Sequence, residues 1–370
     1  MVGHGPADAC RSFPIVVTMT IWRSRALMRY FTCVQSFEKA PPEVKELLGK
    51  RIKELGLRLE GSPVERMIQQ LYKELERKKL RRFRPICYLT DEWGCPSGEP
   101  VIGIPFYLAD PKLASLEKEL NDLEDERQIM MYLRHEAGHA FNYAYALYRT
   151  PEWRERFGPY NRPYRDNYRP VPFSRKYVRH IAGWYAQKHP DEDFAETFAV
   201  WLTPRSNWRR RYREWPAKRK LHYVDRIAKK LGDSDPVVGQ GDFDLTVEQM
   251  DLTLEEFYRR SMEATHHASD LAMAADLADI FFKKGRRRKG IRRAAEIIDA
   301  HRLALTDKIT HWTGVPRPLV RALVESLVRQ CTEQDLWAEA GRESIYVVEL
   351  TAYGTVLAMN YLTRGKFVPA

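Results

Sequence analysis

Two histidines and a glutamate stand at the spacing of a metal-binding helix. They are His135, Glu136 and His139 in the stretch "RHEAGHAFNYAY", residues 134–145. Residues four apart on a helix lie one above the other, so both imidazoles can reach one ion at about 2.0–2.1 Å. Glu136 adjoins that face and can hold a water at the ion without binding the ion itself. The motif predicts a zinc site with Glu136 as general base. The alternative is an ordinary helix whose polar residues bind no metal.

A hydrolytic zinc site also needs a third protein ligand and an open position for water. The stretch "HPDEDFAETFAVWL", residues 189–202, supplies a candidate on a second predicted helix. Glu192 lies in its first turn, and Glu196 follows four residues later on the same face. We expect Glu192 to be the third ligand and Glu196 to accept the ring N–H of a ligating histidine, which fixes its tautomer. A solvent-facing acidic helix is the alternative interpretation.

Hydrophobic spacing predicts the elements that must position these residues. Apolar residues between 130 and 144 recur at steps of three and four, so the metal-binding helix has one buried face. Two earlier helices are expected over 42–57 and 63–80. Short β-rich runs at 84–90 and 101–108 flank a loop that is rich in Pro and Gly, which predicts two strands. The site therefore belongs to a helix-rich domain with a small sheet.

Four stretches, in this order, resemble one known family. They are "LTDEWGCPSGEPVIGIPFYLADPKL", "LRHEAGHAFNYAY", "WYAQKHPDEDFAETFAVWLTPRSNWRRRY" and "WPAKRKLHYV". Over about residues 41–231 the chain resembles the bacterial family of putative zinc-binding metallopeptidases in the gluzincin clan, with a lethal-factor-like site. The resemblance implies an α+β fold: a helix-rich minigluzincin-type catalytic domain with a small β-sheet beside the zinc helix. Unlike many members, this chain has no cysteine-rich zinc ribbon ahead of that domain.

The resemblance also implies two further roles. Tyr185, seven residues before Glu192, is similar to the tyrosine that stabilises the oxyanion in lethal-factor-type enzymes, and Tyr160 or Tyr164 could take that role instead. In such folds the substrate backbone commonly adds to an edge strand beside the zinc helix. Gly103 and Ile104 in "VIGIPFY" are the expected substrate-binding residues.

The chain of 370 residues is long enough for one large domain or two smaller ones. We expect an N-terminal tail over 1–38, a zinc metallopeptidase-like domain over 39–235, and a linker with an all-α C-terminal domain over 236–370. The linker is indicated by "DSDPVVGQGDFD", which is rich in Pro, Gly and Asp.

Charge and cysteine content restrict the surroundings of the protein. The net charge is +11, with basic runs at 77–84, 205–220 and 283–293. Nucleic acid could bind such runs, but a solvated basic surface is favoured because no nucleic-acid motif accompanies them. Five cysteines without a CxxC pair favour a reducing cytoplasm. No signal peptide or membrane span is expected, and the oligomeric state is left open.

The sequence thus predicts a hydrolase with one zinc ion per chain that cleaves a peptide or amide bond through a metal-activated water, with a peptide or protein as substrate. The alternative is a non-catalytic basic protein that binds nucleic acid or a protein partner on a peptidase-like fold.

Overall fold

The structure is a computed structural model that describes residues 41–120, 123–165, 168, 170–263, 274–283, 290–315 and 317–364. The predicted tail, 1–38, lies outside the described residues.

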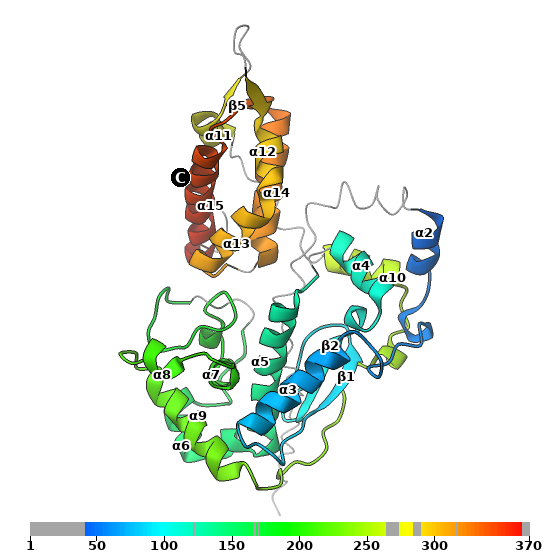
Figure 1. The fold of residues 1–370 in the computed structure, drawn as a ribbon, viewed down its shortest axis with the longest axis vertical. Coiled ribbons are helices and arrows are strands. Elements are labelled where there is room, and N and C mark those ends of the chain that lie inside the picture. The colour runs from blue at the N-terminus through cyan, green and yellow to red at the C-terminus, as the bar shows by residue number, and fades with distance from the viewer. Residues whose placement is uncertain are drawn as a thin grey trace, which may run out of the picture.

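The chain forms two lobes (Figure 1). The elements of the first lobe are α2 (Pro42–Leu48), α3 (Glu65–Arg77), β1 (Ile86–Thr90), β2 (Val101–Pro105), α4 (Pro111–Leu120), α5 (Glu126–Ala144), α6 (Pro151–Phe157), α7 (Pro190–Leu202), α8 (Trp208–Arg211), α9 (Lys218–Leu231) and α10 (Leu254–Glu263). Those of the second lobe are α11 (Ala274–Ile280), β3 (Phe282–Lys283), β4 (Ile291–Arg293), α12 (Ala294–Ala300), α13 (Arg302–Thr313), α14 (Arg317–Glu333), β5 (Leu336–Glu339) and α15 (Glu343–Arg364).

Each lobe has its own hydrophobic core. The first core runs from Leu48 to Tyr258, and the second from Leu277 to Ala358. Helices supply most of both cores, and strands, 3-10 turns and loops supply the rest. The predicted helix-rich α+β class is confirmed.

The sequence places a domain boundary between residues 235 and 236, but the first core extends beyond it. Apolar side chains between 247 and 258 belong to that core. The predicted linker, 233–244, follows the surface of the first lobe, where the N–H of Val237 donates to the carbonyl of Ala144 at 2.8 Å. Pro, Gly and Asp indicate a loop but carry no information about the surface that the loop follows. The second core therefore begins only after α10.

The small sheet of the first lobe lies beside α5. Strands β1 and β2 are parallel, with Ile86 opposite Val101. The loop between them returns so that Gly94 pairs with Gly103 in an antiparallel bridge, with N···O distances of 3.3 and 2.7 Å. Successive residues of a strand direct their backbone groups to opposite sides, so Ile104 faces β1. Neither Gly103 nor Ile104 offers a free backbone edge in this arrangement, and their role in substrate binding stays a prediction.

The second lobe differs from the expected all-α region by a small sheet. Strands β3, β5 and β4 pair antiparallel in that order, and each has two to four residues. Strands this short contain too few residues to show an alternating pattern. The last helix, α15, packs against α13 and α14.

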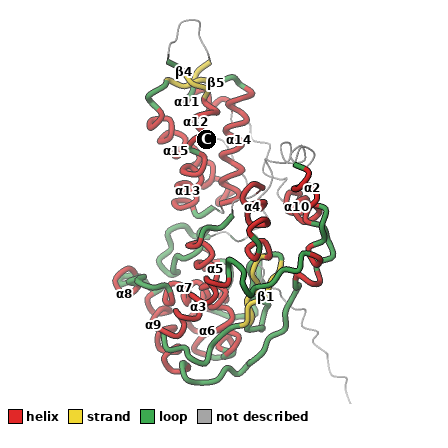
Figure 2. The backbone as a smooth tube through the Cα atoms, turned by 45° about the vertical axis from the view of Figure 1, so that its right-hand side comes forward, coloured by secondary structure: helices red, strands yellow, loops and turns green. Residues whose placement is uncertain are grey.

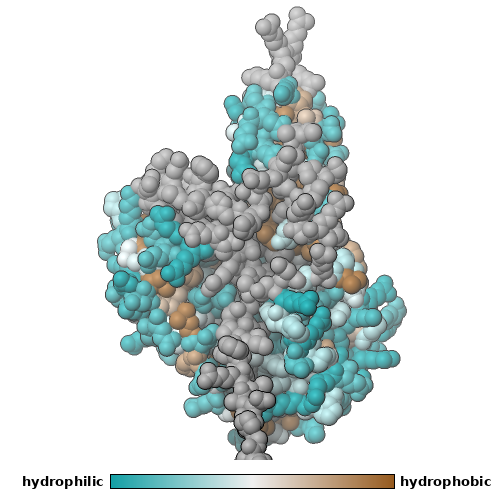
Figure 3. All heavy atoms as spheres, turned by 180° about the vertical axis from the view of Figure 1, so that it is seen from behind, coloured by the Kyte–Doolittle hydropathy of each residue, from teal (hydrophilic) through white to brown (hydrophobic). Residues whose placement is uncertain are grey.

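None of the described helices is long and apolar enough to cross a membrane. The described surface seen from behind is largely hydrophilic, with scattered apolar patches (Figure 3).

Helices α5 and α7 touch backbone to backbone at Gly138. A Cβ on Gly138 would lie 2.7 Å from the Cα and 2.9 Å from the carbonyl oxygen of Ala195. Only glycine permits this approach. Asp125 caps the N-terminus of α5 and forms a capping box with Gln128. The crossing brings the histidine face of α5 against the first turns of α7.

Gly138→Ala should separate these two helices. An added methyl group against backbone cannot be relieved by a rotamer change, so we expect the variant to lose about 1–3 kcal/mol of unfolding free energy. It should also bind zinc more weakly, because the ligands lie on both helices. Chemical denaturation and zinc titration measure the two effects. Gly49→Ala is the control, since a Cβ at that position would lie 3.6 Å from the carbonyl oxygen of Lys45, at an ordinary contact distance. Wild-type stability and zinc affinity in Gly138→Ala would contradict the argument.

Candidate metal site

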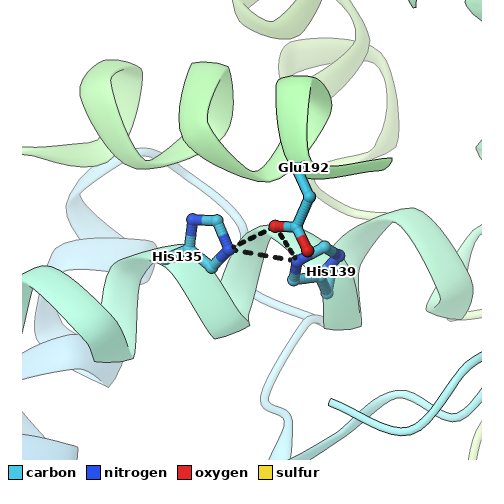
Figure 4. Close-up of side chains that lie close together, drawn as sticks. All are labelled: His135, His139 and Glu192. Carbon is cyan, nitrogen blue, oxygen red and sulfur yellow. Dashed lines mark hydrogen bonds and ion pairs between the residues drawn. The ribbon is translucent and has the colours of Figure 1, made fainter. Parts of the chain in front are cut away.

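Three buried side chains converge where α5 meets α7 (Figure 4). His135 Nε2 lies 3.1 Å from His139 Nε2 and 3.0 Å from Glu192 Oε2, and His139 Nε2 lies 3.2 Å from the same oxygen. An ion held tetrahedrally at about 2.0–2.1 Å separates its ligand atoms by about 3.4 Å. The three atoms therefore form one face of a coordination tetrahedron that needs only slight expansion.

Two further carboxylates fix the orientation of the imidazoles. His135 Nδ1 lies 3.1 Å from Glu196 Oε1, and His139 Nδ1 lies 2.9 Å from Asp191 Oδ2. When each Nδ1 donates its hydrogen to a carboxylate, each Nε2 presents a lone pair. Two such lone pairs and a carboxylate oxygen about 3 Å apart repel one another unless a cation lies between them. The donor set thus fits a zinc ion.

Both outer carboxylates are held by other groups. Glu196 accepts hydrogen bonds from the backbone N–H groups of His180 and Ile181 at 3.0 and 3.1 Å. Asp191 accepts from Asn142 Nδ2 at 2.7 Å and from the hydroxyl of Tyr143. The sequence singled out Glu196 but missed Asp191. Its only signal was its place in the first turn of α7, where acidic residues are common for electrostatic reasons alone.

Glu136 lies beside this cluster with one oxygen unused. Its Oε1 is buried and has no hydrogen-bond partner in the described part of the chain. Loss of solvent raises the pKa of Glu136 to about 7, although the two neighbouring histidines lower it. A carboxylate with this pKa can take and return a proton near neutral pH.

Two tyrosines contact the ligand carboxylate. The hydroxyls of Tyr164 and Tyr185 donate to Glu192 Oε1 at 2.7 and 3.1 Å, and the two oxygens lie 3.2 Å apart. Tyr160 instead lies between Ser97, at 2.8 Å, and Tyr143, at 3.3 Å. Burial raises the pKa of both Tyr164 and Tyr185 well above the usual value, so both phenols stay protonated. Sequence reasoning favoured Tyr185 alone, and the structure brings Tyr164 to the same oxygen.

The charge of the cluster makes metal binding dependent on pH. Burial opposes the charged form of His135, but hydrogen bonds to Glu192 and Glu196 outweigh it and raise the pKa to about 9. Without metal, the folded chain keeps this proton between about pH 6.5 and 9 while the unfolded chain loses it. The stability of metal-free protein therefore falls as the pH rises through this window. A bound zinc ion would displace this proton, so zinc binding would strengthen over the same window.

We therefore expect zinc to stabilise the protein more at pH 8.5 than at pH 6. The difference in Tm between zinc-loaded and chelated protein should widen steadily across this range. Differential scanning fluorimetry at fixed ionic strength measures this Tm difference. A pH series of chelated protein alone should show its Tm falling as the pH rises. A Tm difference that stays constant from pH 6 to 8.5 would contradict protonation of the ligands in the metal-free state.

The basic runs predicted from the sequence bind acidic groups of the protein itself. Lys220 pairs with the buried carboxylate of Asp193. Arg209 lies 2.9 Å from Asp225, and Arg292 pairs with Glu343. These charges are partly neutralised within the fold. Residues 284–289 lie outside the described part of the chain.

Two packed helices thus bring a His-x-x-x-His pair and a distant glutamate together in an arrangement that could hold a metal ion. The family model described as "Putative zinc-binding metallo-peptidase" matches residues 100–209, which include α5, α7 and all three candidate ligands. The resemblance to the family of putative zinc-binding metallopeptidases is confirmed over this segment. No curated protein and no solved structure matches the chain.

Proposed function

We propose that the protein is a gluzincin-type peptidase that holds one zinc ion per chain on His135, His139 and Glu192. The observation that carries the proposal is the convergence of three acceptor atoms, each about 3 Å from the others, with carboxylates behind both imidazoles. A structural zinc site is closed by four protein ligands, whereas three ligands leave a position open for chemistry. The free oxygen of Glu136 beside that position supports a catalytic role over a structural one.

In the proposed reaction, zinc would supply Lewis-acid polarisation of the scissile carbonyl and a lowered pKa for water. Glu136 takes a proton from the water while the water oxygen bonds to the carbonyl carbon. It then delivers that proton to the amine nitrogen as the C–N bond breaks. Tyr185 donates a hydrogen bond to the oxyanion after its hydroxyl turns from Glu192. Tyr164 remains on Glu192 and keeps that carboxylate oriented.

We place the substrate backbone beside the segment 93–95, which pairs with β2, rather than beside Gly103 and Ile104 of β2 itself. Because Gly94 bonds to Gly103, its neighbours Trp93 and Cys95 direct their backbone N–H and C=O groups away from β2. The thiol of Cys95 has a raised pKa, through burial first and the carboxylates of Glu136 and Asp191 next, which supports its position close to the site. Trp93 and Cys95 are only 1 % and 0 % exposed, so a peptide could add to this edge as an antiparallel strand only after the segments that cover it move aside.

The free thiols of Cys87, Cys95 and Cys331 support the expected cytoplasmic location, because a reducing compartment leaves cysteines unpaired.

Digestion of a peptide library with defined termini tests the proposed function. Zinc-loaded protein should generate new N-termini, chelated protein should not, and return of zinc should restore cleavage. A parallel preparation of Glu136→Gln controls for contaminating proteases. Absence of any chelator-sensitive cleavage, or the same cleavage by the variant, would refute the assignment.

A further inference from the structure

The second lobe touches the segment that carries Tyr185. The lower end of α13 faces the loop before α7 in both views (Figures 1 and 2). Gly314 ends α13, with φ of +73°, and Gly183 lies in the loop, with φ of +89°. A Cβ on Gly314 would lie 2.7 Å from Trp184 Cε3 and 3.0 Å from Gly183 N, and one on Gly183 would lie 2.7 Å from the oxygen of Gly314. The two lobes therefore meet through backbone at this point.

This contact bears on a segment with restricted geometry. Trp184 has φ of +49°, a conformation that residues other than glycine seldom adopt. Its ring is only 6 % exposed and packs edge-on to Phe173, with centroids 5.6 Å apart. Tyr168 donates to the Gly183 carbonyl at 2.6 Å. An uncommon backbone conformation persists only where its surroundings enforce it, and Gly314 supplies one side of these surroundings.

Tyr185 follows Trp184 directly. Its side chain is fully buried, and its hydroxyl donates to Glu192 Oε1 at 3.1 Å. A change in the backbone at Trp184 therefore moves the phenol relative to the ligand carboxylate.

We propose that the second lobe is a part of the catalytic unit, in which Gly314 holds the Gly183–Trp184 segment and thereby positions the hydroxyl of Tyr185. This inference rests on the proposed function. Gly314, Gly183 and Trp184 are positioning residues, since they act on the reaction only through Tyr185. The lobe beyond the matched segment, 100–209, thus has a role in turnover.

A glycine at the end of a helix has an ordinary explanation as well, because the left-handed conformation there favours glycine. Asparagine separates the two explanations, since it tolerates this conformation but adds a Cβ. Gly314→Asn therefore keeps the helix end and breaks the contact with Trp184. Gly341→Asn is the matched control in the same lobe, because Gly341 has φ of +83° and a Cβ there would meet no described atom within 4 Å.

The test uses the full-length, zinc-loaded protein. We expect Gly314→Asn to lower kcat by about 10-fold, with KM and zinc content unchanged, because small displacements of a catalytic group reduce turnover. Gly341→Asn should behave as wild type. In the double variant Gly314→Asn/Tyr185→Phe, the loss should equal that of Tyr185→Phe alone, because both changes act on one hydroxyl.

Hydrogen–deuterium exchange supplies a measurement that needs no turnover. Peptides covering residues 182–188 should exchange faster in Gly314→Asn than in wild type or Gly341→Asn. Additive losses in the double variant, higher activity in Gly314→Asn, or unchanged exchange over 182–188 would each overturn the proposal. If wild-type protein cleaves no peptide, the proposed function fails, and faster exchange still establishes that Gly314 holds the segment.

Discussion

Glu136→Gln is expected to abolish peptide hydrolysis while zinc remains bound. The substitution keeps the shape of the side chain and removes its ability to accept a proton. Glu136 contributes no atom to the triangle of ligand atoms, so the metal site keeps its donors. General-base catalysis contributes about 10²–10⁴-fold to a rate, and we expect a loss in the upper part of this range because the proposed mechanism also has this group deliver the proton to the leaving amine.

Elemental analysis and kcat/KM on one cleaved peptide measure the two halves of this prediction. Glu126→Gln is the control, because Glu126 lies on the same helix in an exposed ion pair with Arg66, and such pairs contribute little. A Glu136→Gln variant that keeps its zinc and cleaves at the wild-type rate would remove the general-base role. Loss of zinc would instead show that Glu136 supports the metal site.

The relation between residues within one helix was predictable, because helical geometry fixes it. The spacing of His135 and His139 determined that their side chains share a face, and Glu192 with Glu196 followed the same rule. The association of the two helices was not contained in either motif. It depends on the backbone contact between Gly138 and Ala195, which brings positions more than fifty residues apart together.

Contacts that begin in loops could not be predicted in the same way. Tyr164 reaches Glu192 from an irregular segment whose path no periodic pattern describes. The bridge between Gly94 and Gly103 arises because a loop folds back on its own strand, so β2 is paired on the side that its strand pattern leaves open. Function at such positions depends on long-range packing, and hydrophobic periodicity reports only on local structure.

Glu192→Gln is expected to weaken zinc binding by at least about 100-fold, which exceeds the 10–100-fold typical of groups that only orient a ligand. The amide keeps an oxygen that Tyr164 and Tyr185 can still contact, but it carries no negative charge. The site then holds a divalent cation with two neutral imidazoles, so the buried ion loses a neutralising partner.

Competition with a chromophoric chelator measures this affinity, and Glu196→Gln is the graded comparison. Glu196 contacts His135 only through Nδ1, so its replacement should cost less than that of Glu192. Circular dichroism of the metal-free variants shows whether folding is retained. Equal affinities in the two variants would place Glu192 outside the ligand set. Unchanged zinc content in Glu192→Gln would rule out the gluzincin assignment, because the two histidines alone cannot distinguish this clan from other HExxH proteins.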